Sequence, residues 1–157
     1  MTNTQMINVG TDGAPPVTLM GPPLEPTTNI QKKRILLVDD EVTATRLLKL
    51  NLEQTNQYVV RTENASAGAL AAAVEFQPDL ILLDVIMPGM DGGDLASRFL
   101  AHPNLKSVPI VFLTAIATKT DVQRGDGRIG GLPFLAKPLD LRELLACLKQ
   151  HLGGERR

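Results

Sequence analysis

The chain has 157 residues, 43% of them hydrophobic and 21% charged, which is enough to bury one core and too few for a large multidomain enzyme. Sixteen Lys and Arg against seventeen Asp and Glu give a net charge of −1, which argues against a protein whose main task is to neutralise nucleic-acid phosphates. The single cysteine, Cys147, excludes an internal disulfide and a cysteine-based zinc site. No apolar run approaches the roughly 20 residues that span a bilayer. These features predict a cytoplasmic protein that does not insert into membranes.

The first part of the chain differs in composition from the rest. Residues 1–32 are rich in proline, threonine and asparagine and nearly free of charge, so they cannot build a core and are predicted to be a disordered N-terminal tail. The alternative is a segment that docks on the folded domain through three apolar residues, Val17, Leu19 and Met20. The folded domain is expected at residues 33–152, followed by a short C-terminal tail at 153–157.

Five short apolar runs are predicted to be strands. They occupy residues 35–38, 58–62, 80–84, 110–113 and 134–136, and they alternate with segments of helical character. Three of the runs are almost continuously apolar, which is typical of strands buried on both faces. The pattern predicts an α/β fold, in which a doubly wound parallel five-stranded sheet lies between two layers of helices.

Four of the intervening segments are predicted to be regular helices, at residues 42–54, 66–75, 91–101 and 140–151. Asp140 is placed to cap the last of them. In the third, three side chains are expected to face the sheet: Leu95, Phe99 and Leu100. The segment 117–130 is a weak helix candidate, because Gly125 and Gly127 each cost about 1 kcal/mol relative to alanine in a helix interior.

Polar residues follow four of the five predicted strands. Asp39 and Asp40 come after the first strand, Asp84 closes the third, Thr114 follows the fourth and Lys137 follows the fifth. In a doubly wound sheet the carboxyl ends of the parallel strands share one edge, where ligands bind. Residues nearly 100 positions apart are therefore expected to converge.

The converged residues have a recognisable chemistry. Three neighbouring carboxylates repel one another unless some are protonated or a hard cation joins them, and oxygen ligands favour Mg²⁺. An aspartate beside such a cation is prepared to attack phosphorus and form an acyl phosphate. Lys137 offers a positive charge to a phosphoryl oxygen, and Thr114 offers a hydroxyl donor.

Each residue alone also has a structural interpretation. Asp39 and Asp40 could cap the next helix, Asp84 could begin a loop, Thr114 could simply end a strand, and Lys137 could be a charged residue before a proline. These interpretations do not explain why all of them occur together at the ends of predicted strands. The combination favours a functional site.

Four strings carry a family resemblance: LLVDDE at 36–41, LILLDVIMPGMDG at 80–92, VPIVFLTA at 108–115 and PFLAKP at 133–138. They resemble the receiver domain of two-component response regulators over about residues 33–152, and in particular the single-domain type found in chemotaxis. The resemblance implies a flavodoxin-like fold with strand order 2-1-3-4-5.

The resemblance also implies a role for each site residue. Asp84 matches the phosphoacceptor, Asp39 and Asp40 match the acidic pair that holds Mg²⁺, and the backbone carbonyl of Ile86 matches a further metal ligand. Lys137 matches the family's lysine, followed by a proline that has a cis peptide bond in similar domains.

Two further positions match the family's switch pair, Thr114 and Phe134. In the family this pair changes the protein-binding surface made by the fourth helix, the fifth strand and the fifth helix. Such a change is a local charge event that biases a bistable element.

The function expected from the residues and the resemblance is that of a single-domain response regulator, because only Leu152–Arg157 follow the last predicted helix. A histidine kinase or phosphotransfer protein is expected to donate the phosphoryl group, and a downstream protein to receive the signal. Direct DNA binding and conventional enzyme turnover are not expected, and the chain is expected to be a monomer or a weak dimer. Apolar residues two positions past Asp84 and Thr114, namely Ile86 and Ile116, predict slow self-dephosphorylation.

Two alternatives stay open at this point. The first is a scaffold of the same fold that is never phosphorylated, a reading supported only by the glycines of the weak helix. The second is a Mg²⁺-dependent phosphohydrolase that forms an aspartyl phosphate, although such enzymes are expected to carry Asp-x-Asp after the first strand and Asp84 is followed by Val85 and Ile86. A nucleotide or flavin binder is disfavoured, because no glycine-rich loop follows the first strand.

Overall fold

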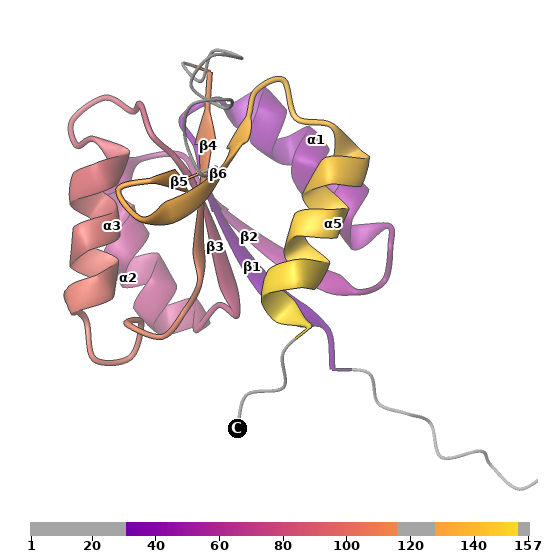
Figure 1. Ribbon diagram of the computed structural model, residues 1–157, viewed down its shortest axis with the longest axis horizontal. Coiled ribbons are helices and arrows are strands. Elements are labelled where there is room, and N and C mark those ends of the chain that lie inside the picture. Colours follow the sequence, from indigo (N-terminus) through magenta and orange to yellow (C-terminus); the bar gives the residue numbers. More distant parts are fainter. Residues whose placement is uncertain (1–30, 116–127, 154–157) are drawn as a thin grey trace, which may run out of the picture. The chain divides into compact units, whose positions relative to one another are not determined.

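The computed structural model describes residues 31–115 and 128–153. Strands and helices alternate along the chain (Figure 1), with these bounds: β1 (Lys33–Val38), α1 (Val42–Glu53), β2 (Tyr58–Glu63), α2 (Ser66–Phe76), β3 (Leu80–Asp84), α3 (Gly92–Ala101), β4 (Ile110–Thr114), β5 (Arg128–Ile129), β6 (Leu132–Ala136) and α5 (Leu141–Leu152). The predicted strands and the four regular helices are confirmed to within two residues at their ends. Asp140 caps α5 as expected, since its carboxylate accepts hydrogen bonds from the backbone N–H groups of Arg142 and Glu143.

The sheet has the order β2-β1-β3-β4-β6-β5. The first five strands in this order are parallel, so the predicted order 2-1-3-4-5 is confirmed with β6 as the fifth parallel strand. The sixth strand was not predicted. It is the two-residue β5, which pairs antiparallel with β6 through a turn at Gly130 and Gly131, both of which have positive φ.

The weak helix predicted over residues 117–130 is wrong at its end, because residues 128 and 129 form β5 and Gly130 lies in the turn. A φ of 57° at Gly130 and of 85° at Gly131 suits a hairpin and breaks a helix. Residues 117–127 of that prediction lie outside the described residues.

Helices cover both faces of the sheet (Figure 1), with α2 and α3 on one face and α1 and α5 on the other. The two central strands, β3 and β4, are buried at every residue, in keeping with their continuous apolar sequences. Each face carries its own apolar cluster, one built around Phe99 of α3 and the other around Leu52, Leu144 and Leu148 of α1 and α5. This packing holds the carboxyl ends of the strands in fixed relative positions.

One expectation about α3 is wrong. Leu95 and Phe99 are buried as predicted, but the side chain of Leu100 is 44% exposed. Leu100 directly follows Phe99, and successive residues of a helix point about 100° apart, so Leu100 lies at the margin of the face that buries Leu95 and Phe99. Among the described residues, no helix is long and apolar enough to cross a membrane.

Side chains from α1 cover part of the outer edge of β2. The N–H of Val60 donates to Glu53 Oε1 over 3.0 Å, and Lys49 Nζ donates to the carbonyl oxygen of Val60 over 2.7 Å. The two side chains also face each other as an ion pair, with 3.6 Å between Lys49 Nζ and Glu53 Oε1. The helix that follows β1 thus satisfies backbone groups of the edge strand.

Candidate functional site

The carboxyl ends of the parallel strands bring three aspartates together. Asp39 and Asp40 directly follow β1, and Asp84 is the last residue of β3, the neighbouring strand. One carboxylate oxygen from each of the three lies within 4.8 Å of the others. Asp39 and Asp84 are buried, with 3% and 5% of their surface exposed, whereas Asp40 is exposed. The convergence predicted for these residues is therefore present.

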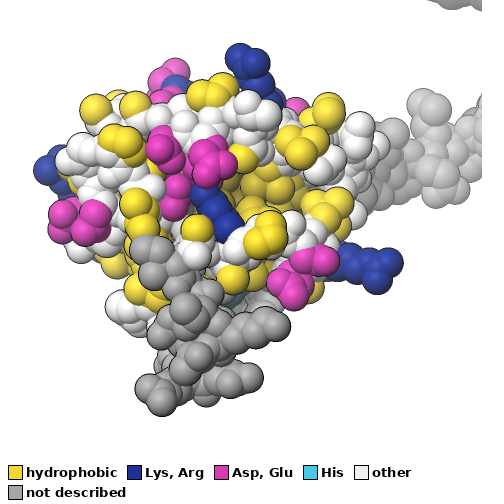
Figure 2. All heavy atoms as spheres, turned by 90° about the horizontal axis from the view of Figure 1, so that it is seen from above, with side chains coloured by type: hydrophobic (Ala, Val, Ile, Leu, Met, Phe, Trp, Pro, Cys, Tyr) yellow, Lys and Arg dark blue, Asp and Glu magenta, His cyan; other side chains and the backbone are white. Residues whose placement is uncertain are grey.

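Lys137 joins the cluster from the loop after β6. Its Nζ donates to Asp39 Oδ2 over 2.6 Å and lies 3.3 Å from Asp84 Oδ2. The backbone N–H of Lys137 donates to the carbonyl oxygen of Thr114 over 2.8 Å, which ties the loop to the end of β4. The Lys137–Pro138 peptide bond is cis, as the resemblance implies. Figure 2 shows acidic side chains around a basic one at this edge of the sheet.

Each buried carboxylate also anchors its own loop. Asp39 Oδ1 accepts from the N–H of Glu41 over 2.9 Å, and Asp84 Oδ1 accepts from the N–H of Ile86 over 3.1 Å. The N-cap residue of α1 is Glu41, and no side chain makes a capping hydrogen bond to this helix. The structural interpretation of Asp39 and Asp40 as helix caps is therefore not what the structure shows, and both oxygens of Asp39 and Asp84 are committed to the site.

Burial and charge shift two pKa values in the cluster. Burial has the largest influence on the pKa of Asp84 and raises it, the Ile86 N–H and Lys137 lower it, and the charge of Asp39 raises it, so that it lies above the ordinary value of 3.8. Burial by itself would lower the pKa of Lys137. The hydrogen bond and charge of Asp39, followed by those of Asp84, outweigh burial and raise the pKa of Lys137. The lysine is thus held in its charged form beside the carboxylates.

The donor set suits a divalent cation with hard oxygen ligands. Three carboxylates converge, and one of them has a raised pKa, while only the one ammonium of Lys137 offsets their charge among the described residues. Oxygen ligands without histidine or cysteine favour Mg²⁺ over zinc. The residues present therefore fit the metal that the sequence predicts.

The remaining predicted residues surround the aspartates. Thr114 ends β4 and is 2% exposed, next to Ala136 of β6 in the parallel register. Phe134 lies on β6 opposite Phe112 and is half-buried against the apolar cluster on the α2 and α3 face. Ile86 lies two residues beyond Asp84, and its side chain is 53% exposed. Ile116 lies outside the described residues.

A glycine lies directly against the backbone of Asp84. A Cβ atom added to Gly92 would lie 2.4 Å from the carbonyl oxygen of Asp84 and 2.8 Å from the Cα of Val85. The N–H of Gly92 also donates to the carbonyl oxygen of Val85 over 2.8 Å. The first turn of α3 can therefore pack closely against the loop after β3 only because residue 92 has no side chain.

The sequence analysis does not single out Asn64, which the structure places at the edge of the site. Asn64 directly follows β2, and its side-chain amide donates to the carbonyl oxygen of Asp39 over 2.7 Å and to Thr45 Oγ1 over 3.0 Å. Its position gives the one available signal. With Asn64 included, a polar residue lies at or directly after the carboxyl end of each of the five parallel strands.

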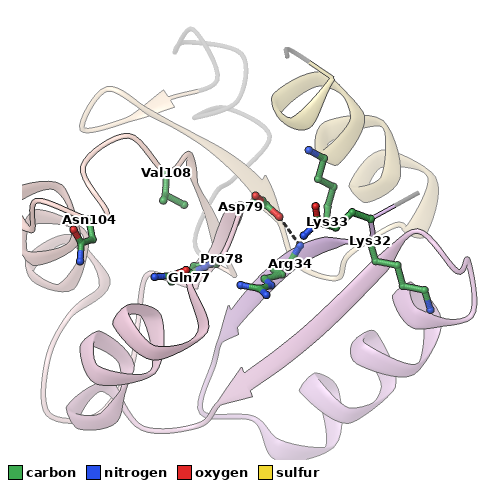
Figure 3. A pocket seen from close by; sticks show the side chains of 9 residues that line it. Lys32, Lys33, Arg34, Gln77, Pro78, Asp79, Asn104 and Val108 are labelled. Carbon is green, nitrogen blue, oxygen red and sulfur yellow. Dashed lines mark hydrogen bonds between the residues drawn. The ribbon is translucent and has the colours of Figure 1, made fainter. Parts of the chain in front are cut away.

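Two cavities lie at opposite edges of the sheet. One of about 580 Å³ adjoins Asp39 and Lys137, and its apolar walls come from α1 and from the segment before α5, including Leu47, Leu48 and Leu139. This hollow lies beside the acidic cluster in Figure 2. The other, of about 600 Å³, lies at the amino edge, where Lys32, Lys33, Arg34, Gln77 and Asp79 line it (Figure 3).

Comparison with known proteins supports the same reading. The sequence profile of the response regulator receiver domain matches residues 35–149. Protein PilH of Pseudomonas aeruginosa is 32% identical over 121 residues, which are 77% of this chain and 98% of PilH. The DNA-binding dual master transcriptional regulator RpaA of Synechocystis is 34% identical over 116 residues, which are 74% of this chain and 47% of RpaA. The chain thus spans about half of one relative and nearly all of the other.

A solved structure shows the same fold with a metal. The receiver domain of a sensor histidine kinase from Pseudomonas aeruginosa has a magnesium ion in its active-site cleft, and it matches with a TM-score of 0.67 and 29% identity over 78% of this chain and 99% of its own. The fold, the acidic cluster and the profile match agree. The chain belongs to the response regulator receiver domain family of two-component signalling.

Proposed function

We propose that the protein accepts a phosphoryl group on Asp84 from a phosphohistidine of a partner kinase or phosphotransfer protein. The observation that carries the proposal is the position of the buried Asp84 carboxylate. It lies within 4.8 Å of the carboxylates of Asp39 and Asp40 and 3.3 Å from Lys137 Nζ. A buried carboxylate with a raised pKa, placed among charged groups, is a candidate nucleophile.

The transfer exchanges one phosphorus bond for another. A carboxylate oxygen of Asp84 attacks the phosphorus of the donor, the P–N bond breaks, and its electron pair remains on the histidine ring, which then takes up a proton. Lys137 is placed to pair with a phosphoryl oxygen once Asp84 no longer carries the negative charge. Thr114, buried at the end of β4, is the candidate hydroxyl donor to another phosphoryl oxygen.

The residues that would hold Mg²⁺ are Asp39, Asp40, Asp84 and the backbone carbonyl of Ile86. When bound, the cation supplies charge neutralisation, which reduces the repulsion between an anionic donor and an anionic acceptor. The magnesium ion in the cleft of the Pseudomonas aeruginosa histidine kinase receiver domain supports this assignment. We also propose residues 33–152 as the receiver domain and the cytoplasm as its location.

The proposed output is a change in a protein-binding surface. Thr114 and Phe134 occupy neighbouring parallel strands, and the Thr114 carbonyl accepts from Lys137, so a phosphoryl group on Asp84 acts on residues already linked to β6. The half-buried Phe134 is the side chain proposed to respond. The downstream target is proposed to be a protein, and the match to nearly the full length of PilH supports a regulator that acts through its receiver domain.

Intact-mass spectrometry after incubation with Mg²⁺ and acetyl phosphate tests the proposal. We expect the gain of one phosphoryl group by the wild-type chain and none by Asp84→Asn or in the absence of Mg²⁺. Asp94→Asn is the matched control, because Asp94 is an exposed aspartate in the first turn of α3 and should leave the adduct unchanged.

Two results would contradict the proposal in different ways. A folded wild-type protein that gains no phosphoryl group with Mg²⁺ present would favour the scaffold that is never phosphorylated. Steady release of phosphate from small phosphomonoesters, with many turnovers per protein molecule, would favour the phosphohydrolase.

A further inference from the structure

Asn64 lies at the junction between β2 and the acidic pair. It is half-buried, and its side-chain amide donates two hydrogen bonds, one to the carbonyl oxygen of Asp39 and one to Thr45 Oγ1. Thr45 is 2% exposed, and its hydroxyl in turn donates to the carbonyl oxygen of Val42 over 2.9 Å. The amide therefore connects the backbone after β1 to the first turn of α1.

Asp39 needs such support because it lies outside the sheet. Strand β1 ends at Val38, so the regular ladder no longer fixes the backbone of Asp39. The residues at the end of β2 replace the ladder: the carbonyl oxygen of Glu63 accepts from the N–H of Asp39 over 3.1 Å, and Asn64 donates to its carbonyl oxygen over 2.7 Å. Both backbone polar groups of Asp39 are thus held by two successive residues.

The peptide plane that Asn64 holds is the one that leads into Asp40. Among the described residues, no hydrogen bond holds the Asp40 carboxylate, so the position from which this side chain extends is set by its backbone alone. Asp39 has its own anchors at Glu41 and Lys137. Loss of the amide should therefore affect Asp40 most.

We propose that Asn64 is a positioning residue for the acidic pair. Its amide fixes the peptide between Asp39 and Asp40, and thereby the backbone from which both carboxylates reach to within 4.8 Å of the Asp84 carboxylate. This inference rests on the proposed function, because it assigns Asn64 a role in holding Mg²⁺. Outer groups that orient metal ligands typically account for about 10–100-fold in metal affinity.

Mg²⁺ titration of the full chain by isothermal calorimetry, combined with urea unfolding of the same variants, tests the role. We expect Asn64→Ala to weaken Mg²⁺ binding about tenfold in the folded protein. Thr55→Ala is the matched control. Like Asn64, Thr55 makes two side-chain hydrogen bonds, one to the Leu52 carbonyl oxygen and one from the Gln57 N–H, but it lies in the turn after α1. Thr55→Ala should lower stability by a similar amount and leave Mg²⁺ affinity unchanged.

A second pair of variants keeps the test decisive if Asn64→Ala folds poorly. Thr45→Val removes the hydroxyl that accepts the hydrogen bond from the Asn64 amide, and it should weaken Mg²⁺ binding about threefold. Thr45→Ser keeps the hydroxyl and should bind Mg²⁺ as the wild type does. Combined with Asn64→Ala, Thr45→Val should add less than its separate effect, because the two side chains share one hydrogen bond.

The outcomes separate this inference from the proposed function. Two results would overturn the role of Asn64 and leave the proposed function standing. In the first, the wild type and Asn64→Ala bind Mg²⁺ with the same affinity. In the second, Thr55→Ala weakens Mg²⁺ binding as much as Asn64→Ala does. Failure of the wild-type chain to bind Mg²⁺ at millimolar concentration would overturn both proposals.

Discussion

The two edges of the sheet carry similar kinds of residue and differ in burial. At the carboxyl edge, Asp39 and Asp84 are almost fully buried and share Lys137. At the amino edge, Arg34 is exposed, and its backbone N–H donates to Asp79 Oδ2 over 2.8 Å, while Lys32 and Lys33 extend away from that pair (Figure 3). The comparison shows that charges at a strand end form a cluster with shifted pKa values where the fold also removes them from water.

Burial changes what each charge contributes. Exposed ion pairs contribute about 0–1 kcal/mol, because water screens them and ordering the side chains costs entropy. Buried carboxylates cannot rely on water, so at the carboxyl edge the pKa of Asp84 rises and Lys137 is held between two acids. The carboxyl edge therefore holds carboxylates that repel one another, and a bound cation would reduce that repulsion.

The largest effect is expected at Gly92, on which the carboxyl edge depends. Gly92→Ala places a Cβ atom against the backbone of Asp84 and Val85, which cannot move aside as a flexible side chain would, and should cost about 3 kcal/mol of unfolding free energy. Gly93→Ala is the control, because its Cβ would meet only the carboxylate tip of Asp91 at 3.1 Å. Urea unfolding measures the free energy of unfolding of both variants. If the two variants are equally stable, the close contact at residue 92 does not require a glycine.

Removal of one cation from each edge should sharpen the contrast. Without Mg²⁺, Lys137→Met leaves Asp39 and Asp84 without their shared partner and should cost about 2 kcal/mol, because a buried pair is broken on one side. Since the pKa of Lys137 is raised in the folded protein, the contribution of the charged lysine to stability is complete at pH 7. This contribution is lost only as the pH rises through the raised pKa.

The counterpart at the amino edge is Arg34→Met. It removes an exposed hydrogen bond to the Phe76 carbonyl oxygen and a cation–π contact with the Phe76 ring, and should cost about 0.5 kcal/mol. Thermal unfolding of both variants in EDTA is the measurement. A cost at Arg34 as large as that at Lys137 would contradict the comparison.

Neutralising Asp84, the proposed acceptor, should stabilise the metal-free protein. Asp84→Asn removes a buried charge and is expected to raise the unfolding free energy by about 1 kcal/mol at pH 7 without Mg²⁺. The pKa of Asp84 is raised in the folded protein, so the ionised form opposes folding above that pKa. The advantage of Asp84→Asn should therefore shrink as the pH falls and vanish below the unfolded-state pKa of 3.8. Unfolding midpoints from pH 3 to pH 8 test this, and an advantage that grows toward low pH would be the wrong sign.

The smallest effect concerns the lifetime of the phosphoryl group. Ile86→Asn replaces an apolar side chain beside the acceptor by a polar one that can orient water, and should shorten the lifetime about threefold, a modest factor because Ile86 is already 53% exposed. Leu100→Asn removes a comparably exposed apolar side chain from α3 and should have no effect. Phosphate release from the phosphorylated chain gives both rates. A wild-type lifetime of seconds at neutral pH would contradict the slow dephosphorylation predicted from Ile86 and Ile116.

The sequence predicts the parallel strands and the aspartates for one physical reason. Strands buried on both faces must be continuously apolar, so the first charged residue after each run, such as Asp39 or Lys137, marks the edge of the sheet. The same reasoning does not find β5, because two residues carry no periodic pattern, although the Gly130–Gly131 pair is a hairpin signal. Asn64 escapes it too, because an asparagine after a strand that itself contains Arg61 and Glu63 does not stand out.

The exposed position of Leu100 shows a second limit. Two apolar residues in sequence on a helix suggest a wide buried stripe, but only the packing partner decides how wide that stripe is. The sheet accepts Leu95 and Phe99 and leaves Leu100 in solvent. Sequence periodicity places the centre of a helix face better than its margins.

The side chains that cover β2 have a consequence for how this molecule meets others. An open strand edge is a template on which a foreign strand can extend the sheet, a route to aggregation. Here a newcomer alongside β2 would first have to displace Lys49 and Glu53 from the backbone of Val60. At the opposite edge, β5 pairs with Leu132 and Pro133 of β6. At Val60, the backbone groups that an added strand would need are therefore already hydrogen-bonded within the chain.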